Sequence, residues 1–178
     1  MRTFLINKRL HVEPFNLDVT ENRSPDFKVS SSETGSFFFC EVKSIGTVID
    51  EGGLSFNRVF NIFTAKIHDT IGQFTAVNSA HIVPNVLAFV TSTFQVNSNT
   101  FREFLQGCIL TTEGQELIAD LRKISDNTKN ELKTLDLCLF FQGDKVDFFF
   151  TGRDKYLRDI LIGLFGVERG SLEGIYIT

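Results

Sequence analysis

The sequence predicts an α+β fold, with a single twisted, mainly antiparallel sheet, two or three helices packed against it and an N-terminal arm. Apolar and aromatic runs typical of strands recur at residues 37–43, 83–96 and 137–150. Two other stretches, 55–70 and 154–165, carry apolar residues at the three- and four-residue spacing of a helix face. The chain has 178 residues, 42% of them hydrophobic and 22% charged, which is the size and composition of one domain.

Residues 1–36 differ in composition from the rest. Pro14, Pro25 and a run rich in Ser, Thr and Gly favour loops, with one short strand at Thr3–Val12. We therefore expect residues 1–36 to form a flexible N-terminal arm and residues 37–178 to form the globular α+β domain.

The domain is expected to open with a strand followed by a helix. In Phe37–Lys43 the aromatic and apolar side chains alternate, which predicts a strand partly buried on both faces. Ser55 is a suitable N-cap for a helix that runs to about Thr70 and ends at Gly72. A short strand is then expected at residues 73–77.

The middle of the chain is less regular. Val83–Val96 is rich in β-branched and aromatic residues and predicts a strand. Thr100–Ile109 is ambiguous, although Thr100 could cap a short helix. Thr112 and Gln115 match a capping box, which predicts a helix from Thr112 to Leu135, either as one long helix or as two short ones.

The C-terminal part has the clearest pattern. Two apolar strands within Leu137–Phe150 flank Gln142–Asp144, and a short turn containing glycine between two such strands predicts a hairpin. A helix is expected at residues 154–165, with Gly166 as its C-cap. A last strand is expected at Leu172–Ile177.

The sequence carries no recognisable catalytic, metal-binding or cofactor-binding motif. The histidines do not follow zinc-ligand spacing, and the cysteines are far apart, so we interpret the cysteines as reduced, mostly buried thiols. Neither a nucleophile elbow nor a phosphate-binding glycine loop occurs. The closest acid pair, Asp144 with Asp147, is interpreted as part of a solvated turn. We therefore expect no enzyme activity, no metal and no cofactor.

Charge and aromatic content suggest contacts rather than catalysis. The chain has 18 Lys and Arg against 22 Asp and Glu, a net charge of -4, which argues against strong direct binding of nucleic acid. It has 20 phenylalanines, of which Phe4 and Phe15 lie outside the predicted core patterns. The residues expected to mediate self-association or membrane contact are Lys8, Arg9, Pro14 and Phe15 in the arm, with Leu54 and Val83 as exposed apolar contacts.

The order of the expected elements and several short strings resemble the matrix proteins of rhabdoviruses, especially the small ones of plant-infecting cytoplasmic members. The strings are Phe38–Lys43, Val86–Val90 and Ile160–Ile177. The resemblance implies a viral structural protein of the virion and the host cytoplasm, which self-associates through its arm, binds viral nucleoprotein and links the nucleocapsid to the envelope membrane. The chain departs from animal-virus relatives in lacking a P-P-x-Y or P-T-A-P string for budding.

Two other classes of function stay open. A small acidic viral or phage binding module could inhibit a host protein by meeting a basic partner. An enzyme whose site follows no familiar motif is the third alternative, and a deep pocket with converging polar groups would favour it.

Overall fold

The computed structural model confirms the α+β fold with a single main sheet. It describes residues 1–15, 24–46, 49–50, 53–54, 56–92, 96–113, 116–121, 123–152 and 154–166. In chain order the elements are α1 (Arg2–Asn7), β1 (Leu10–Pro14), β2 (Phe27–Ser31), β3 (Phe37–Ile45), β4 (Ile49–Asp50), β5 (Gly53–Leu54), α2 (Phe56–Val77), β6 (Asn85–Thr91), α3 (Ser98–Gln106), β7 (Cys108–Glu113), β8 (Glu116–Leu121), α4 (Asp126–Leu132), β9 (Leu137–Gln142), β10 (Lys145–Phe150) and α5 (Lys155–Phe165).

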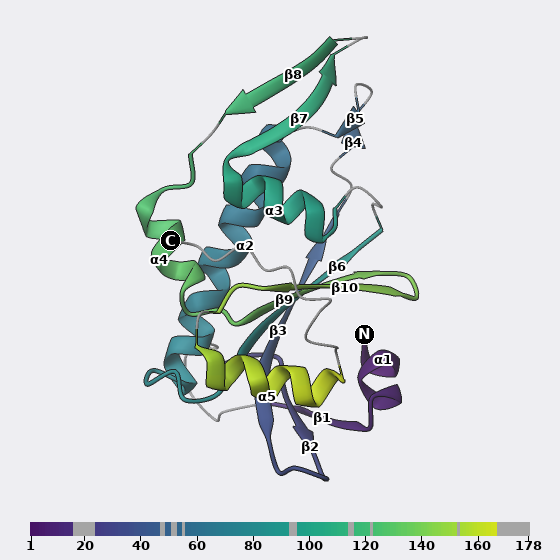
Figure 1. The fold of residues 1–178 in the computed structure, drawn as a ribbon, viewed down its shortest axis with the longest axis vertical. Coiled ribbons are helices and arrows are strands. Elements are labelled where there is room, and N and C mark those ends of the chain that lie inside the picture. Colours follow the sequence, from purple (N-terminus) through teal and green to yellow (C-terminus); the bar gives the residue numbers. More distant parts are fainter. Residues whose placement is uncertain are drawn as a thin grey trace.

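The main sheet has six strands in the order β1-β2-β3-β6-β9-β10. Three of its five pairings, β1–β2, β2–β3 and β9–β10, are antiparallel, as the mainly antiparallel prediction requires. β3, β6 and β9 are parallel to one another because α2 returns the chain between β3 and β6. Figure 1 shows β7 and β8 as a separate two-stranded ribbon that extends from one end of the molecule.

Helices cover both faces of this sheet, and side chains of each central strand alternate between the two resulting cores. On β3, Phe39 packs in the core under α2, α3 and α4, whereas Phe38 packs in the core under α1 and α5. By the same alternation, Glu41 and Lys43 lie on the α2 side of β3. The sheet therefore carries two charged side chains toward the longest helix.

The described parts of residues 1–36 form one edge of the sheet. The short strand predicted at Thr3–Val12 is right only at its end, where β1 begins at Leu10, because its first part lies in helix α1. β2 adds a further strand that the sequence did not predict. Leu5 and Val29 are fully buried, and Gly35, at φ +70°, makes the tight turn from β2 into β3. Paired strands and buried leucine and valine side chains outweigh the local turn composition. The boundary between a flexible arm and a domain at residue 36 stays a prediction.

Helix α2 is longer than predicted, and the short strand expected at residues 73–77 is wrong. The helix continues through Gly72 to Val77 because Phe74 extends the buried face that Phe63 and Ile67 begin. Burial of an aromatic ring outweighs the cost of a helical glycine, which is about 1 kcal/mol.

The helix expected from Thr112 is also wrong, because residues 108–113 pair with 116–121 as an antiparallel ribbon. β-branched residues on both sides of the turn favour strands and outweigh the local capping pattern. A helix forms only at α4, where the Ser125 side chain accepts a hydrogen bond from the amide of Thr128. The ambiguous stretch near Thr100 is helix α3, and Asn97 is its N-cap.

The C-terminal predictions are confirmed as far as the structure describes them. β9 and β10 form the expected hairpin, with Gly143 at φ +59° in the turn. α5 begins after the N-cap Asp154 and ends at Gly166 in the left-handed conformation. The strand predicted at Leu172–Ile177 lies outside the described residues.

The two phenylalanines expected on the surface are packed against other rings. Phe4 lies 5.6 Å from Phe141 and 6.3 Å from Phe165 between ring centroids, and Phe15 lies 5.0 Å from Phe39. No helix of the described chain combines the length and apolar character needed to cross a membrane.

Candidate functional site

The residues expected to make contacts are spread over the molecule. Lys8, Arg9 and Pro14 are exposed beside and along the edge strand β1. Phe15 is half-buried on Phe39. Their role in self-association or membrane contact stays a prediction.

The apolar contacts have a different setting from the one expected. Val83 is half-buried and packs against the core under α2, so the exposed apolar side chain of this turn is Ile82, at 72%. The backbone of Leu54 pairs with Ile49, and its side chain lies outside the described residues.

The structure brings together a cluster of charged residues that the sequence analysis missed. Asp26 immediately precedes β2, and Glu41 lies opposite it on β3, where the register pairs Phe27 with Cys40. The backbone amide of Asp26 donates to Glu41 Oε2 at 3.1 Å, and the amide of Val42 donates to Asp26 Oδ2 at 2.8 Å. These reciprocal bonds tie each carboxylate to the backbone of the neighbouring segment.

Asp26 is held from its other side as well. Its carbonyl accepts a hydrogen bond from the amide of Phe15 at 3.0 Å, at the end of β1. Pro25, just before it, is buried, whereas Asp26 itself is exposed. The carboxylate of Asp26 is therefore held by the amide of Val42 and its backbone by the amide of Phe15, while the residue stays open to solvent.

Glu41 is a buried carboxylate in a central strand. Its side chain is 3% exposed, and Lys43 Nζ lies 2.7 Å from its Oε1. Burial raises the pKa of Glu41, and the charge of Asp26 raises it further, while hydrogen bonds from Lys43 and Gln73 oppose the rise. Burying the charge of Glu41 costs free energy that its ion pair with Lys43 offsets only in part. Ionisable groups whose pKa is shifted by burial and by neighbouring charges are typical of functional sites.

Helix α2 completes the cluster from above the sheet. Gln73 lies close enough to the Glu41 carboxylate to lower its pKa, and Gln73 Oε1 is buried without a partner. A pocket of about 530 Å³ is lined by Lys43 and Gln73, together with Glu131 of α4. Lys43 is 17% exposed and lines this pocket, so the cluster is connected with solvent.

Asp26 and Glu41 offer carboxylate oxygens, the ligand type that divalent cations such as Mg²⁺ prefer. Among the described residues no group of three or more His, Cys, Asp or Glu side chains is placed to hold a metal. Mg²⁺, however, needs only one or two protein carboxylates, since waters and substrate phosphate oxygens supply its other ligands. Asp26, Glu41 and Lys43 together carry a net charge of about -1 when ionised, which a divalent cation would reverse. The unpartnered Oε1 of Gln73 could accept a hydrogen bond from a bound water.

One pattern in the sequence could have revealed this cluster. Glu41 and Lys43 occupy alternate positions of an otherwise aromatic and apolar strand, so their side chains must point to the same face of the sheet. Two ionisable residues in such a strand need partners. The partner, Asp26, is distant in sequence and comes close only through the pairing of β2 with β3.

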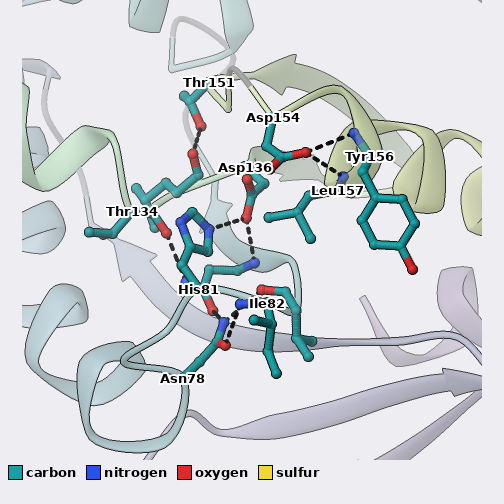
Figure 2. A network of polar contacts seen from close by, with 12 residues as sticks. Asn78, His81, Ile82, Thr134, Asp136, Thr151, Asp154, Tyr156 and Leu157 are labelled. Carbon is teal, nitrogen blue, oxygen red and sulfur yellow. Dashed lines mark hydrogen bonds and ion pairs between the residues drawn. The ribbon is translucent and has the colours of Figure 1, made fainter.

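A second polar network lies where β6 and β9 begin, and Figure 2 shows Asp136 at its centre. Oδ2 of Asp136 accepts from the backbone amide of Asn85 at 2.8 Å and lies 2.8 Å from His81 Nε2. The Asn78 side chain donates to the carbonyl of Val83 at 2.6 Å and to Asn85 Oδ1 at 2.9 Å. The network ties the turn after α2 to two parallel strands.

The network also joins the loop before β9 to the end of β10. The hydroxyl of Thr151 donates to the carbonyl of Leu135, and the amides of Thr151 and Gly152 donate to the carbonyl of Asp136. Within the described chain His81 contacts Asp136 and no hydroxyl or thiol that could act as a nucleophile. The pair therefore lacks the third member of a hydrolytic triad.

Comparison of the chain with protein-family models, with curated proteins and with solved structures finds no match.

Proposed function

We propose that this chain is a divalent-cation-dependent phosphodiesterase, whose site consists of Asp26, Glu41, Lys43 and Gln73. The observation that carries the proposal is that Asp26 and Glu41 are linked through reciprocal backbone hydrogen bonds, with Lys43 Nζ 2.7 Å from Glu41 Oε1. Phosphoryl transfer requires mainly positioning and the neutralisation of charge on the phosphate oxygens. A cation on the carboxylate pair and a lysine beside it supply both.

Each residue has a distinct task in this proposal. Asp26 and Glu41 would hold the cation, and their backbone hydrogen bonds fix their orientation. The cation, when bound, polarises a phosphate oxygen and lowers the pKa of water. Lys43 would donate a hydrogen bond to the oxygen on which negative charge develops, and Gln73 would help to keep Glu41 ionised, since it lowers the pKa of Glu41.

This proposal departs from the expected non-enzymatic function. The matrix-protein function implied by the rhabdovirus resemblance stays a prediction, as do self-association, binding to nucleoprotein and location in the virion. None of those functions accounts for a buried Glu41 and an exposed Asp26 held together on the main sheet. A cation-dependent reaction does account for them.

The test is cleavage of supercoiled plasmid DNA and of labelled DNA and RNA oligonucleotides by the full-length chain, with Mg²⁺ or Mn²⁺ and with EDTA. The wild-type protein is expected to cut at least one of these substrates only when the cation is present. Glu41→Gln and Asp26→Asn each keep one side-chain oxygen that can accept the backbone hydrogen bond while they remove the charge. Glu41→Gln also removes the ion pair with Lys43, so its fold is checked by circular dichroism.

Asp144→Asn is the matched control, because Asp144 is an exposed carboxylate in the turn between β9 and β10. We expect Asp26→Asn and Glu41→Gln to abolish cleavage and Asp144→Asn to leave it unchanged. Absence of cation-dependent cleavage by the wild-type protein, or equal cleavage by Glu41→Gln prepared in the same way, would overturn the proposal.

A further inference from the structure

Strand β1 is an open edge of the main sheet within the part of the chain that the structure describes, where it pairs with β2 alone. The amide of Phe15 donates to the carbonyl of Asp26 at 3.0 Å and continues the register of the two strands. In an antiparallel pair, residues bonded to the neighbouring strand alternate with residues whose backbone groups point away from it. Counting back from Phe15, the residues whose backbone groups point outward are Leu10, Val12 and Pro14.

Only the last position of β1 resists pairing with a further strand. Proline has no N–H to donate, and natural sheets use proline to protect their edges. Pro14 does so at the end of β1, whereas Leu10 and Val12 keep both a donor and an acceptor on the outward side. These two residues can therefore form backbone hydrogen bonds with another strand.

The side chains of β1 divide between the two faces of the sheet. Leu10 and Val12 are buried in the core under α1 and α5. His11 and Glu13 lie on the opposite face and are exposed, with His11 Nε2 3.0 Å from Glu13 Oε1. The strand therefore carries two apolar side chains on one face and a base and an acid on the other.

This pattern is complementary to itself in one register. When two copies of β1 lie antiparallel with Val12 opposite Val12, His11 of each copy lies opposite Glu13 of the other. The two Val12 residues can then exchange backbone hydrogen bonds, and the amide of Leu10 faces the carbonyl of Pro14 in the second copy. A register with His11 opposite His11, or with Glu13 opposite Glu13, loses the complementary pairs. Charge complementarity thus favours a second copy of this chain at the edge.

We propose that two copies of this chain associate edge to edge through antiparallel β1 strands, about a two-fold axis at Val12, so that their main sheets form one continuous sheet. The same residues serve on both sides of such a contact. Leu10 and Val12 supply its backbone hydrogen bonds, and His11 and Glu13 supply its side-chain contacts. Because the strand is short, the interface is small and the dimer should dissociate on dilution.

The first test traps this register with a disulfide in the full-length protein. Positions 11 and 13 of opposite strands would have Cα atoms about 4.5 Å apart, which suits a disulfide, whereas position 11 of one copy lies about 7 to 8 Å from position 11 of the other. Under mild oxidation, an equimolar mixture of His11→Cys and Glu13→Cys should therefore form covalent dimers severalfold faster than either variant alone. Both side chains are exposed, so the substitutions should preserve the fold, and the wild-type protein measures the background.

The second test measures the dimer by sedimentation velocity over a range of protein concentrations. Glu13→Lys puts two positively charged or basic groups opposite each other and should weaken the dimer at least about tenfold. Adding His11→Glu to the same chain restores opposite charges and should recover the association. Asp144→Lys makes the same change of charge in the exposed turn between β9 and β10 and should leave the dimer unchanged.

A wild-type protein that stays monomeric at about 0.5 mM would overturn the proposal, because the edge would then not bind a second copy. A dimer whose mixed cysteine variants cross-link no faster than each variant alone would also overturn it, since the copies would meet through another surface. Neither result depends on phosphodiester cleavage, so this proposal and the proposed function can fail separately.

Discussion

Lys43 is a single lysine on an aromatic strand, and its Nζ lies 2.7 Å from a buried carboxylate. If it stabilises charge during phosphoryl transfer, its effect belongs to the transition state rather than to substrate binding. Lys43→Met retains most of the apolar side chain, so the packing against α2 is preserved.

We therefore expect Lys43→Met to lower kcat by about 100-fold or more with little change in KM. The comparison variant is Lys28→Met on the neighbouring strand β2, whose ammonium lies 4.6 Å from the ring centroid of Phe37. Steady-state kinetics on a labelled oligonucleotide measure both. An equal loss of kcat in the two variants would show that removing Lys43 disturbs the sheet and does not remove a group that takes part in the reaction.

His81 makes stability depend on pH. Its hydrogen bond with Asp136 raises its pKa above the ordinary 6.5, with smaller contributions from the charges of Asp136 and Asp154 and an opposing one from burial. A raised histidine pKa stabilises the fold fully below the unfolded value, and this contribution is lost as pH rises through the folded value.

The free energy of unfolding should therefore fall as the pH rises from 6.5 through the raised pKa of His81. His81→Asn removes this titration and suits the backbone, since asparagine tolerates the φ of +49° at this position. Urea unfolding at several pH values measures the difference between the two proteins, in which the titration of His68 cancels. Parallel curves would show that the bond from His81 to Asp136 does not form in solution.

At the scale of elements, the loop before β9 and the end of β10 meet through Asp136 and Gly152. A Cβ on Gly152 would lie 2.5 Å from Asp136 Oδ1 and 2.9 Å from its Cα, so one of the two segments would have to move. Because Asp136 also bonds Asn85, movement there would disturb β6.

Gly152→Ala is expected to lower the free energy of unfolding by about 1 to 3 kcal/mol. Gly163→Ala, in the interior of α5 with no atom near the added Cβ, should instead raise it by about 0.5 to 1 kcal/mol. Urea denaturation of both variants gives the comparison. A stable Gly152→Ala protein would contradict the close approach of the two segments.

Elements that depend on local sequence were predicted well. The hairpin of β9 and β10 follows from two apolar runs around Gly143, and α5 follows from its cap residues and its apolar face. The prediction failed for β7 and β8. A capping pattern near Thr112 suggested a helix there, whereas residues 108–113 pair with residues 116–121. A local sequence pattern does not determine which other segment a strand will pair with.

The candidate site was missed for the same reason. Glu41 and Lys43 were visible as charges in an apolar strand, but Asp26 sat in a stretch interpreted as a loop-rich arm. Gln73 was assigned to a short strand rather than to the helix that carries it over the sheet. These four residues come together only through strand pairing and the path of α2. Neither can be predicted from a few neighbouring residues.

At the scale of the whole molecule, a net charge of -4 limits how nucleic acid can bind. A protein without a broad basic surface releases few counterions, so binding should depend on the cation at the site more than on surface lysines and arginines.

The logarithm of 1/KM for an oligonucleotide, plotted against the logarithm of NaCl concentration, should have a slope no steeper than about -2. The measurement is made at constant Mg²⁺ so that only the monovalent salt changes. A slope several times steeper would reveal an extended cationic interface and would contradict the small, cation-centred contact that the cluster implies.

The central claim is that Asp26 and Glu41 together hold one divalent cation. Binding of Mn²⁺ to the full-length chain, followed by the loss of its free electron-spin resonance signal, measures this directly. The account predicts one site that is lost in both Asp26→Asn and Glu41→Gln and retained in Asp144→Asn. Absence of Mn²⁺ binding by the wild-type protein, or binding that both site variants retain, would contradict the account.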